Sequence, residues 1–444
     1  MYVAPPPGNA PFNVAFERFE HAVRVLDRSP IRDGEYLHWD KLRHLTPPED
    51  LTPEEWWSAI KWSRRAMRRD LPLKDSSGNP FTYTTPDSAL RLLHYVDQRC
   101  AGQIAMDEVV TTDDQARSHY LVNSLMEEAI RSSQLEGAVT SRGVAKELLR
   151  SGREPKDRSE RMILNNYRAL QFMREEMGDS LTPQAVLELH RIVTDGTLDD
   201  PDAAGRLQRP EDDRIAVIDS ADDKVLHRPP PAEQLPGRLA ALCDFANEPD
   251  DAEQFLHPVV RGVLLHFWLA YDHPFEDGNG RTARALFYWF MRQRGYWLVE
   301  YLSISRILRD GPSQYAKAFL FTETDDCDAT YFLLYHLQVV RRAIEELHAY
   351  LERKTAEIRE VERLLKSSGT FNHRQLAVLS DALRDPGRAY TYGSHATSHG
   401  VTHETARTDL SRLVADGLLQ RRRVGGRQYE FVPVANLSEL LRDL

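Results

Sequence analysis

Most of the chain carries apolar residues at the spacing of an α-helix. Residues 113–137 show it clearly, with one apolar stripe that ends before Gly137, a typical helix stop. The stripe consists of Leu121, Val122, Leu125, Met126, Ala129 and Ile130. Further helices are predicted at residues 53–71, 159–177, 182–198, 231–248, 257–272, 281–296 and 330–367. Since the segment 257–272 is almost entirely apolar, we expect it to be central and buried.

Two regions depart from this helical pattern. Residues 214–218 (RIAVI) and 224–227 (KVLH) are short β-type runs joined by polar residues, which predicts a hairpin flap. Residues 368–444 predict a helix, a helix-turn-helix and a β wing around VGGR, the pattern of a winged helix. The fold class is therefore mainly α, with a hairpin flap, a helical extension at the N-terminus and a winged helix at the C-terminus.

The length of 444 residues predicts two to four domains. We place an N-terminal helical extension at 1–110, a central domain at 111–350, a connector helix at 351–367 and the winged helix at 368–444. The long helix that ends the central domain gains charge toward the connector, and no internal repeat is present. We recognise no candidate catalytic or binding residues in residues 1–110, whose aromatic side chains are expected to pack a core.

Composition narrows the class of protein. A net charge of −11 argues against a nucleic-acid coat or a polybasic membrane binder, although a local basic patch is compatible with it. The three cysteines, Cys100, Cys243 and Cys327, form no CxxC pair, which fits a reducing compartment. No signal peptide and no segment of membrane-spanning length is recognised, so we expect a cytoplasmic protein without membrane contact.

The largest group of candidate functional residues lies in HPFEDGNGRTAR, residues 273–284, between two apolar helices. Gly278-Asn279-Gly280 can turn backbone N–H groups inward as an anion nest at a helix N-terminus. Arg281 and Arg284 share a helix face and suit phosphate oxygens. Asp277 is a ligand type for Mg²⁺, and His273 can accept a proton near neutral pH. A plain turn would explain GNG alone, but the combination favours a site for a polyphosphate, a metal and a nucleophile.

This stretch resembles the signature of the Fic family, H-x-F-x-[DE]-G-N-G-R-x-x-R, without a departure. The resemblance extends over roughly residues 113–345, with an apolar helix before the motif and the flap upstream. It implies a protein adenylyltransferase, an enzyme that transfers AMP from ATP to a Ser, Thr or Tyr hydroxyl of a target protein or of itself. The central domain would then be a Fic catalytic domain, with ATP as substrate and Mg²⁺ as cofactor. Family members with phosphocholine or phosphoryl chemistry depart at motif positions that are intact here.

The resemblance also implies residue roles. His273 would deprotonate the target hydroxyl, Phe275 would anchor the loop, and Asp277 would bind Mg²⁺. Arg281 and Arg284 would hold the β- and γ-phosphates. The flap at 215–227 would hold the target by strand addition. The nucleotide would lie against residues of the signature, of the flap and of one later helix: Asp277, Gly278, Asn279, Gly280, Arg281, Thr282, Arg284, Lys224, Val225, Leu226, His227 and Tyr315.

The end of the helix at 113–137, RSSQLEG, resembles the inhibitory motif of the same family, [ST]-x-x-x-E-[GN]. Ser132, Glu136 and Gly137 match it, in the class with the inhibitory helix before the core. The resemblance implies that Glu136 pairs with Arg284 and displaces the γ-phosphate. On spacing alone, an ordinary helix end with a glycine cap would explain the same residues.

The C-terminal winged helix offers a second partner. Residues 384–432 contain eight arginines and five acidic residues, a mild basic bias suited to phosphate contacts. The candidate DNA contacts lie on the predicted recognition helix and wing: Arg407, Arg412, Arg421, Arg422 and Arg423. A winged helix that serves protein contacts or homodimerisation is an alternative.

Three other functional hypotheses stay open at the level of sequence. The chain could be a DNA-binding regulator whose Fic module senses ATP. It could also run the reverse chemistry, removing AMP, with Glu136 positioning a water. A zinc site of His257, His266 and His273 is weakly supported, because His257 precedes a proline and His266 lies on a buried helix.

Overall fold

The computed structural model describes residues 3–8, 16–25, 35–101, 114–212, 214, 217–218, 225–250, 255–368, 370–384, 386–423 and 429–442. The chain divides into two compact units. The first consists of Met1–Gly102 and Ser124–Ile344, and the second of Gln103–Asn123 and Glu345–Leu444. Among the described residues, no helix combines the length and the apolar character needed to cross a membrane.

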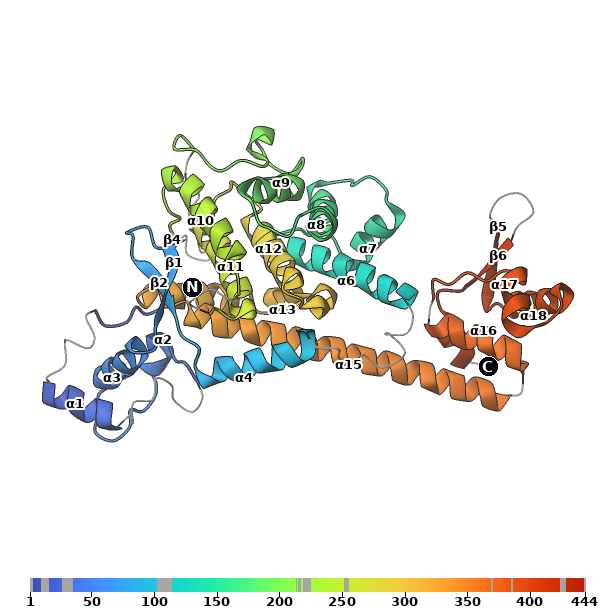
Figure 1. Ribbon diagram of the computed structural model, residues 1–444, viewed down its shortest axis with the longest axis horizontal. Helices are drawn as coiled ribbons and strands as arrows, with labels where there is room; N and C mark the ends of the chain where they lie inside the picture. The colour runs from blue at the N-terminus through green and yellow to red at the C-terminus, as the bar shows by residue number, and fades with distance from the viewer. Residues whose placement is uncertain are drawn as a thin grey trace. The chain divides into compact units, whose positions relative to one another are not determined.

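The first unit is built on helices. They are α6 (Asp114–Leu135, in this unit from Ser124), α7 (Arg142–Ser151), α8 (Arg158–Glu175), α9 (Pro183–Thr194), α10 (Leu235–Asn247), α11 (Pro258–Asp272), α12 (Asn279–Gln293), α13 (Ile304–Asp310), α14 (Pro312–Thr324) and the start of α15 (Thr330–Ser368). Short 3₁₀ turns lie at Pro201–Ala203, Ala232–Gln234 and Trp297–Tyr301. The mainly α fold class is confirmed (Figure 1).

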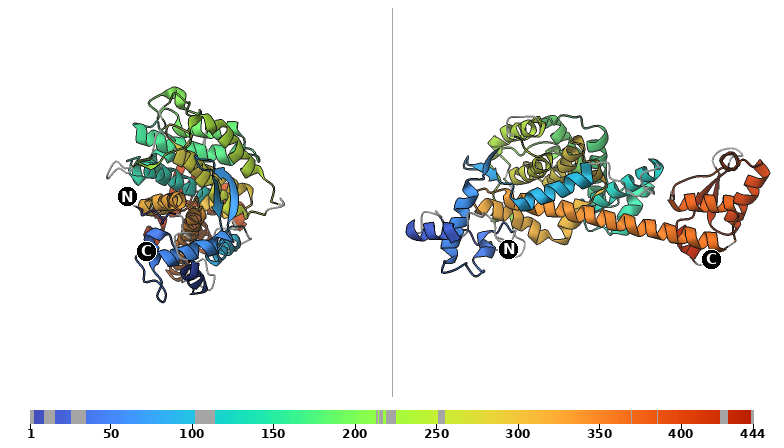
Figure 2. Two further views of the ribbon diagram at one scale, coloured as in Figure 1. Left: turned by 90° about the vertical axis from the view of Figure 1, so that its left-hand side faces the viewer. Right: turned by 60° about the horizontal axis from the view of Figure 1, so that its bottom comes forward.

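Helices α11 and α12 form the centre of this unit. They pack most extensively against each other, while α12 also contacts α8 and α9, and α10 covers α11. Both views of Figure 2 keep these helices together in one group. Almost every residue of α11 is buried, as its apolar sequence predicts. The short turn between α11 and α12 is therefore fixed by the two most buried helices of the fold.

The predicted hairpin flap is present. Strand β3 (Val217–Ile218) pairs antiparallel with β4 (Val225–His227), and Val217 lies opposite His227. The connection at 219–224, with the candidate residue Lys224, lies outside the described residues. The flap returns the chain toward α11 through His227, whose side chain is buried.

The N-terminal extension contains α1 (Phe16–Val25), α2 (Trp39–Leu42), α3 (Pro53–Arg65), β1 (Arg69–Lys74), β2 (Pro80–Tyr83), α4 (Asp87–Val96) and a π-helical turn, Asp97–Ala101. The helix expected at 53–71 was predicted too long, because α3 ends at Arg65 and a strand follows. Leu71 and Leu73 are buried while their neighbours are exposed, a period of two that fits a strand.

This extension is attached to the end of α14 and the start of α15 by buried polar contacts. Lys61 Nζ lies 2.5 Å from Asp325 Oδ1, and the Tyr36 hydroxyl donates to Asp328 at 2.6 Å. The backbone N–H of Thr82 donates to the carbonyl of Cys327 at 2.9 Å. Removing one partner of the buried Lys61–Asp325 pair would leave an uncompensated charge, so this pair holds the extension against the end of α14.

The second unit contains the C-terminal helices and hairpin. They are α16 (His373–Arg384), α17 (Tyr392–His399), α18 (His403–Ala415), β5 (Leu419–Arg423), β6 (Tyr429–Pro433) and α19 (Leu437–Arg442). Thr402 caps α18 by accepting from the N–H of Thr405. The expected order of helix, helix-turn-helix and hairpin is present, and α19 is an addition. The tip of the wing, VGGR, lies outside the described residues.

Candidate active site

The loop of the signature begins and ends with a left-handed residue. His273 ends α11 with φ 45°, and Gly278 precedes α12 with φ 80°. A histidine in this region carries strain that its surroundings must hold, which is a common property of functional positions. At Gly278 a Cβ atom would lie 2.8 Å from Thr194 Cγ2 and 3.3 Å from Val193 Cγ1, so the loop sits directly on α9.

Arg214 holds the backbone around His273. Its guanidinium donates to the carbonyl of Asp272 at 2.8 Å and to that of His273 at 2.9 Å. It also contacts the Gln208 side chain, and the backbone N–H of Gln208 donates to the carbonyl of Pro274 at 2.9 Å. One fork of donors on two successive carbonyls fixes the peptide planes on both sides of the His273 Cα.

The middle of the loop is closed by Asn279 and His190. Asn279 accepts from the Phe275 N–H at 2.9 Å and donates to the Phe275 carbonyl at 2.8 Å. His190 stacks on the fully buried Phe275 ring, with centroids 3.7 Å apart. Its Nδ1 accepts from the Gly205 N–H at 3.0 Å, so its Nε2 donates to the Asp277 carbonyl at 2.9 Å. Phe275 is thus an anchor, and the Asn279 side chain is fully used in closing the loop.

The imidazole of His273 is half-buried. Burial and then the charge of His227 lower the pKa of His273 to about 4, with Arg214 acting in the same direction. The Ala270 carbonyl and the Glu136 carboxylate act in the opposite direction. A lowered pKa means that the neutral form is present above that value, so His273 is free to accept a proton at neutral pH.

Arg281 and Asp277 form a pair at the start of α12. Arg281 is fully buried, donates to the Val193 carbonyl at 3.1 Å and lies 3.4 Å from Asp277 Oδ2. The Asp277 side chain is 36% exposed and lies 3.7 Å from Arg158. The carboxylate therefore faces outward between two cations. Thr282 is buried and donates to the Gly278 carbonyl at 2.9 Å.

Arg284 is occupied by the inhibitory motif. Its Nε and Nη2 donate to Ser132 Oγ at 2.9 and 2.8 Å, and its Nη1 lies 2.9 Å from Glu136 Oε1. Arg284 is buried, and although burial acts to lower its pKa, Glu136 raises it. A Cβ on Gly280 would lie 2.2 Å from Glu136 Oε1, so the carboxylate rests on the glycine nest. Gly137 follows with φ 94° and lets the chain turn away.

Glu128 is a contact of α6 that the sequence interpretation missed. Its buried carboxylate accepts from Ser303 Oγ at 2.8 Å, from the Ser305 N–H at 3.2 Å and from Ser305 Oγ. Burial raises its pKa, while these bonds and the charge of Arg284 oppose the rise. Glu128, Ser132 and Glu136 are spaced by four residues on one helix face, a signal that could have revealed it.

The remaining candidates have distinct surroundings. The half-buried Tyr315 places its hydroxyl 2.8 Å from His266 Nε2, and the charges of Arg284 and Glu136 act on that hydroxyl, so this tyrosine lies beside the Arg284 end of the site. His257 lies 3.0 Å from Asp97 Oδ2, so the three histidines of the zinc hypothesis have different partners. Val225 is exposed on β4, and Leu226 belongs to the same strand.

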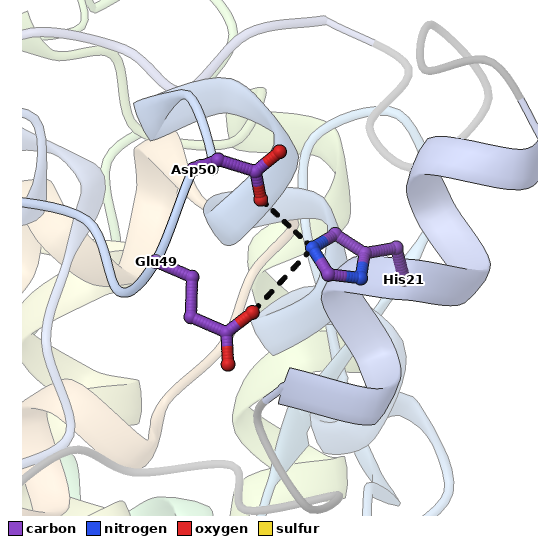
Figure 3. A group of neighbouring side chains, drawn as sticks. All are labelled: His21, Glu49 and Asp50. Carbon is purple, nitrogen blue, oxygen red and sulfur yellow. Dashed lines mark hydrogen bonds and ion pairs between the residues drawn. The ribbon is translucent and has the colours of Figure 1, made fainter.

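A second cluster of possible ligands lies outside this site. In Figure 3 the ring of His21 faces Asp50 at 2.9 Å and Glu49 at 3.6 Å. Asp50 is 68% exposed and also pairs with Arg18 at 2.8 Å. The hydrogen bond from Arg18, followed by that from His21, lowers the pKa of Asp50 to about 2. Because two basic groups already satisfy this carboxylate, the cluster is a surface ion network that joins α1 to the loop before α3.

The fold and the loop define a class of protein. It has a helical core with a short hairpin flap, and a His-to-Arg loop between its two most buried helices. Residues 180–291 match the sequence model of the Fic/DOC family, so this segment of the chain is similar to that family. The resemblance expected from the signature is confirmed for this part of the chain.

Known proteins similar to this chain agree with the assignment. It is 31% identical over 137 residues to "Protein adenylyltransferase Fic" of Nematostella vectensis, over 30% of this chain and 29% of the relative. It is 28% identical over 169 residues to "Protein adenylyltransferase fic-1" of Caenorhabditis elegans, and the alignment covers 36% of this chain and 30% of the relative. The aligned part thus spans less than a third of these relatives.

A solved structure supports the fold alone. A Fic family protein from Desulfovibrio desulfuricans G20 superposes with a TM-score of 0.51 at 18% identity. The superposition covers 80% of this chain and 98% of that chain. The shared fold therefore extends beyond the segment matched by the family model.

Proposed function

We propose that this protein is a protein adenylyltransferase that transfers AMP from ATP to a hydroxyl side chain of a target protein or of itself. The proposal rests on one loop, which has a general base at one end and a phosphate-binding cation at the other. At one end His273 is an unprotonated base, and at the other the buried Arg284 is paired with Glu136. The match to the Fic/DOC family and the relatives named as protein adenylyltransferases support the same activity.

In the proposed reaction, His273 takes the proton of the target hydroxyl while its oxygen attacks the α-phosphorus of ATP. A new P–O bond forms, the bond from the α-phosphorus to the bridging oxygen breaks, and pyrophosphate leaves with the electron pair. The N–H groups of Gly278, Asn279 and Gly280, at the N-terminus of α12, favour the phosphate charge. Arg281 and Arg284 would hold the outer phosphates by charge-assisted hydrogen bonds.

The site fits a Mg²⁺ ion on the Asp277 side. A carboxylate oxygen is a hard ligand, and Mg²⁺ in nucleotide sites commonly takes one or two carboxylates plus phosphate oxygens. Asp277 provides one, partly exposed and on the outer side of the loop. When bound, the ion would neutralise phosphate charge. The paired cations Arg281 and Arg158 lie close enough to do part of this work.

We further propose that α6 inhibits the enzyme. Glu136 takes the guanidinium face that the γ-phosphate needs, and it rests on Gly280, where a phosphate would bind the nest. Arg284 is buried, and a buried cation is costly to leave unpaired unless another anion replaces the carboxylate. Activation therefore requires α6 to release Arg284 before the triphosphate can take its reactive position.

Labelled ATP tests both proposals on the full chain. With Mg²⁺ and ATP labelled at the α-phosphate, Glu136→Gly should incorporate at least about ten-fold more label than wild type, since releasing one charged contact is worth about 1.4 kcal/mol or more. Glu136→Gln keeps the helix end but removes the charge and should act in the same direction. ATP labelled at the γ-phosphate should leave no label on protein.

The control is His273→Ala, which should abolish labelling in every background because no base remains. Retained labelling of that variant would rule out His273 as the base. Equal labelling of wild type and Glu136→Gly would rule out inhibition by α6. Incorporation of γ-label would indicate phosphoryl transfer instead of AMP transfer.

The flap is the proposed docking strand for the target. Strand β4 carries the exposed Val225 and ends at His227, which contacts the end of α11. A short exposed strand can pair with an extended peptide and bring its hydroxyl to a fixed place beside the base. The nucleotide would lie below this strand, against the nest.

A second candidate function, DNA binding, rests on the exposed arginines of the second unit. Arg421, Arg422 and Arg423 are exposed on β5, and Arg407 is exposed on α18. Arg421 stacks on Tyr429, and Arg407 lies 3.5 Å from Glu404, an exposed ion pair of small energy. Arg412 donates to the Thr370 carbonyl at 2.9 Å, which favours a structural role for it.

A mobility-shift titration of the full chain against duplex DNA at several salt concentrations tests this candidate. Binding should weaken with salt, and replacing Arg421, Arg422 and Arg423 by Gln should lower the salt slope by about three. Arg388→Gln, which removes an arginine paired with Asp381, is the matched control. An unchanged salt slope in the triple variant would show that these three arginines do not contact DNA phosphates.

A further inference from the structure

His227 and Glu323 form a polar pair beside the catalytic loop, outside the signature. His227 is the last residue of β4 and is buried, and Glu323 lies in the last turn of α14. His227 Nδ1 is 2.7 Å from Glu323 Oε2, and His227 Nε2 is 2.7 Å from the carbonyl oxygen of Tyr271. Tyr271 precedes His273 by two residues, so this bond reaches the end of the helix that carries the base.

Both partners of the His227 ring are acceptors. A neutral imidazole has one N–H and can serve only one of them, whereas an imidazolium donates to both. A short bond from a protonated ring to a carboxylate is charge-assisted and favoured where water has little access. The geometry therefore assigns a proton to each ring nitrogen of His227, with Glu323 as the counter-ion.

The end of α14, which carries Glu323, is held by contacts between the neighbours of Glu323 and the N-terminal extension. His38 stacks on Phe321 with ring centroids 4.3 Å apart, and its Nε2 lies 3.2 Å from the hydroxyl of Thr324. Asp325, at the end of the helix, is paired with Lys61. These contacts flank Glu323 on both sides in sequence, so the extension at residues 1–110 has a role in fixing this carboxylate.

We propose that His227 is a positioning residue for the AMP transfer, whose protonated ring ties the flap to the end of α11 and places a cation beside the helix end that carries His273. This inference rests on the proposed function, since it concerns the base of that reaction. Strand β4 would then have two roles: it would bind the target peptide, and through His227 it would place a positive charge beside the base His273.

The charged groups that face His273 act in both directions. His227 on β4 and Arg214 before the flap are cations that disfavour a second proton on His273. Glu136 on α6 and the Ala270 carbonyl on α11 favour it. Release of Glu136 during activation removes one of the two opposing groups. Because the phosphates that replace Glu136 are anions as well, a cation at His227 opposes protonation of His273 in the active state too.

The test compares Glu136→Gly alone with Glu136→Gly carrying His227→Gln. A glutamine can donate one hydrogen bond to the Tyr271 carbonyl but carries no charge. The acid limb of the kcat/KM profile should move to higher pH, although burial of His273 remains, so that the ratio of labelling at pH 5 to labelling at pH 8 falls by about two-fold. A uniform loss at all pH values, with the limb unmoved, would overturn the proposal and indicate packing only.

His257→Gln is the matched control, because His257 also pairs with a carboxylate, Asp97, but is not one of the main causes of the lowered pKa of His273. The acid limb of the pH profile of this control should lie at the same pH as in Glu136→Gly alone. If His227→Gln fails to fold, Glu323→Gln is the second variant. Without its counter-ion, His227 should lose its second proton, and the acid limb should move in the same direction.

An activity-independent measurement separates this inference from the proposed function. Histidine NMR of the full chain, labelled at Cε1, follows the titration of His273, whose signal is assigned by its absence in His273→Ala. The midpoint should rise in His227→Gln and stay unchanged in His257→Gln. If Glu136→Gly shows no labelling, the proposed function fails, and the NMR midpoint still decides the inference. An unmoved midpoint overturns it.

Discussion

The two ends of the catalytic loop differ in how their polar groups are satisfied. At the His273 end, backbone carbonyls of residues 271–274 accept from His227, Arg214 and the Gln208 N–H, all fixed parts of the first unit. At the Arg284 end, the guanidinium donates to Ser132 and forms an ion pair with Glu136 of α6. One end is held by its own scaffold and the other by a helix that carries a rival anion.

The difference follows from what each end must do. A general base has to stay within hydrogen-bond reach of its substrate, so its backbone benefits from permanent donors. A phosphate-binding arginine must be free when the substrate arrives, yet a buried cation without any partner is strongly destabilising. An exchangeable carboxylate resolves this conflict, because it satisfies Arg284 until a phosphate replaces it.

We expect the largest effect on AMP transfer from removing Arg214, which holds the backbone at the His273 end of the loop. In the Glu136→Gly background, Arg214→Ala should lower AMP transfer by about 100-fold, since a misplaced base costs about this much. Arg214→Lys should recover little, because one ammonium cannot reproduce a fork on two carbonyls. Single-turnover labelling and the melting temperature are the measurements.

Arg206→Ala is the control for this change, since Arg206 is a nearby arginine paired with Asp212. It should leave AMP transfer within a factor of about two, as expected for a surface ion pair. If Arg214→Ala retained nearly full activity in a folded protein, the His273 end would not need its donors, and the comparison between the two ends would fail.

A smaller and opposite effect is expected from weakening the exchangeable end at a distance. Glu128→Gln in the otherwise wild-type chain should raise labelling about five-fold, because losing about 1 kcal/mol of charge-assisted bonding to Ser303 and Ser305 loosens α6. Glu127→Gln is the matched control, since its carboxylate pairs with Arg131 and Arg142 away from Arg284. Equal labelling of both variants would show that Glu128 does not anchor the inhibitory helix.

The parts of this site that could be predicted from sequence are those with local patterns. The apolar segments 257–272 and 281–296 indicated α11 and α12, and the signature between them identified the loop. The pair Glu136–Arg284 followed from the family resemblance, and the structure brings the two side chains to 2.9 Å. The helices and the loop are each encoded within a few helical turns, whereas the distant pair Glu136–Arg284 could be predicted only because each partner belongs to a motif of the family.

What could not be predicted depends on partners far apart in the chain or on backbone acceptors. Arg214 and His227 bind carbonyls, which leave no trace in residue identity. Glu323 meets His227 across 96 residues, and no periodicity links them. The strand Arg69–Lys74 was missed because its alternation is only six residues long and follows directly on a strong helix.

The smallest effect tests the exchangeable end at its centre. Ser132→Ala removes the hydroxyl that accepts from Nε and Nη2 of Arg284, but the Ser132 carbonyl remains at 3.2 Å from Nη2 and Glu136 keeps its pair. We expect labelling to rise about two-fold, the effect of about 0.5 kcal/mol. Ser133→Ala, whose hydroxyl donates to the Met162 carbonyl, should not raise labelling. A ten-fold rise in Ser132→Ala would mean that the hydroxyl, and not the carboxylate, carries most of the inhibition, because it alone would then hold Arg284 away from the phosphate.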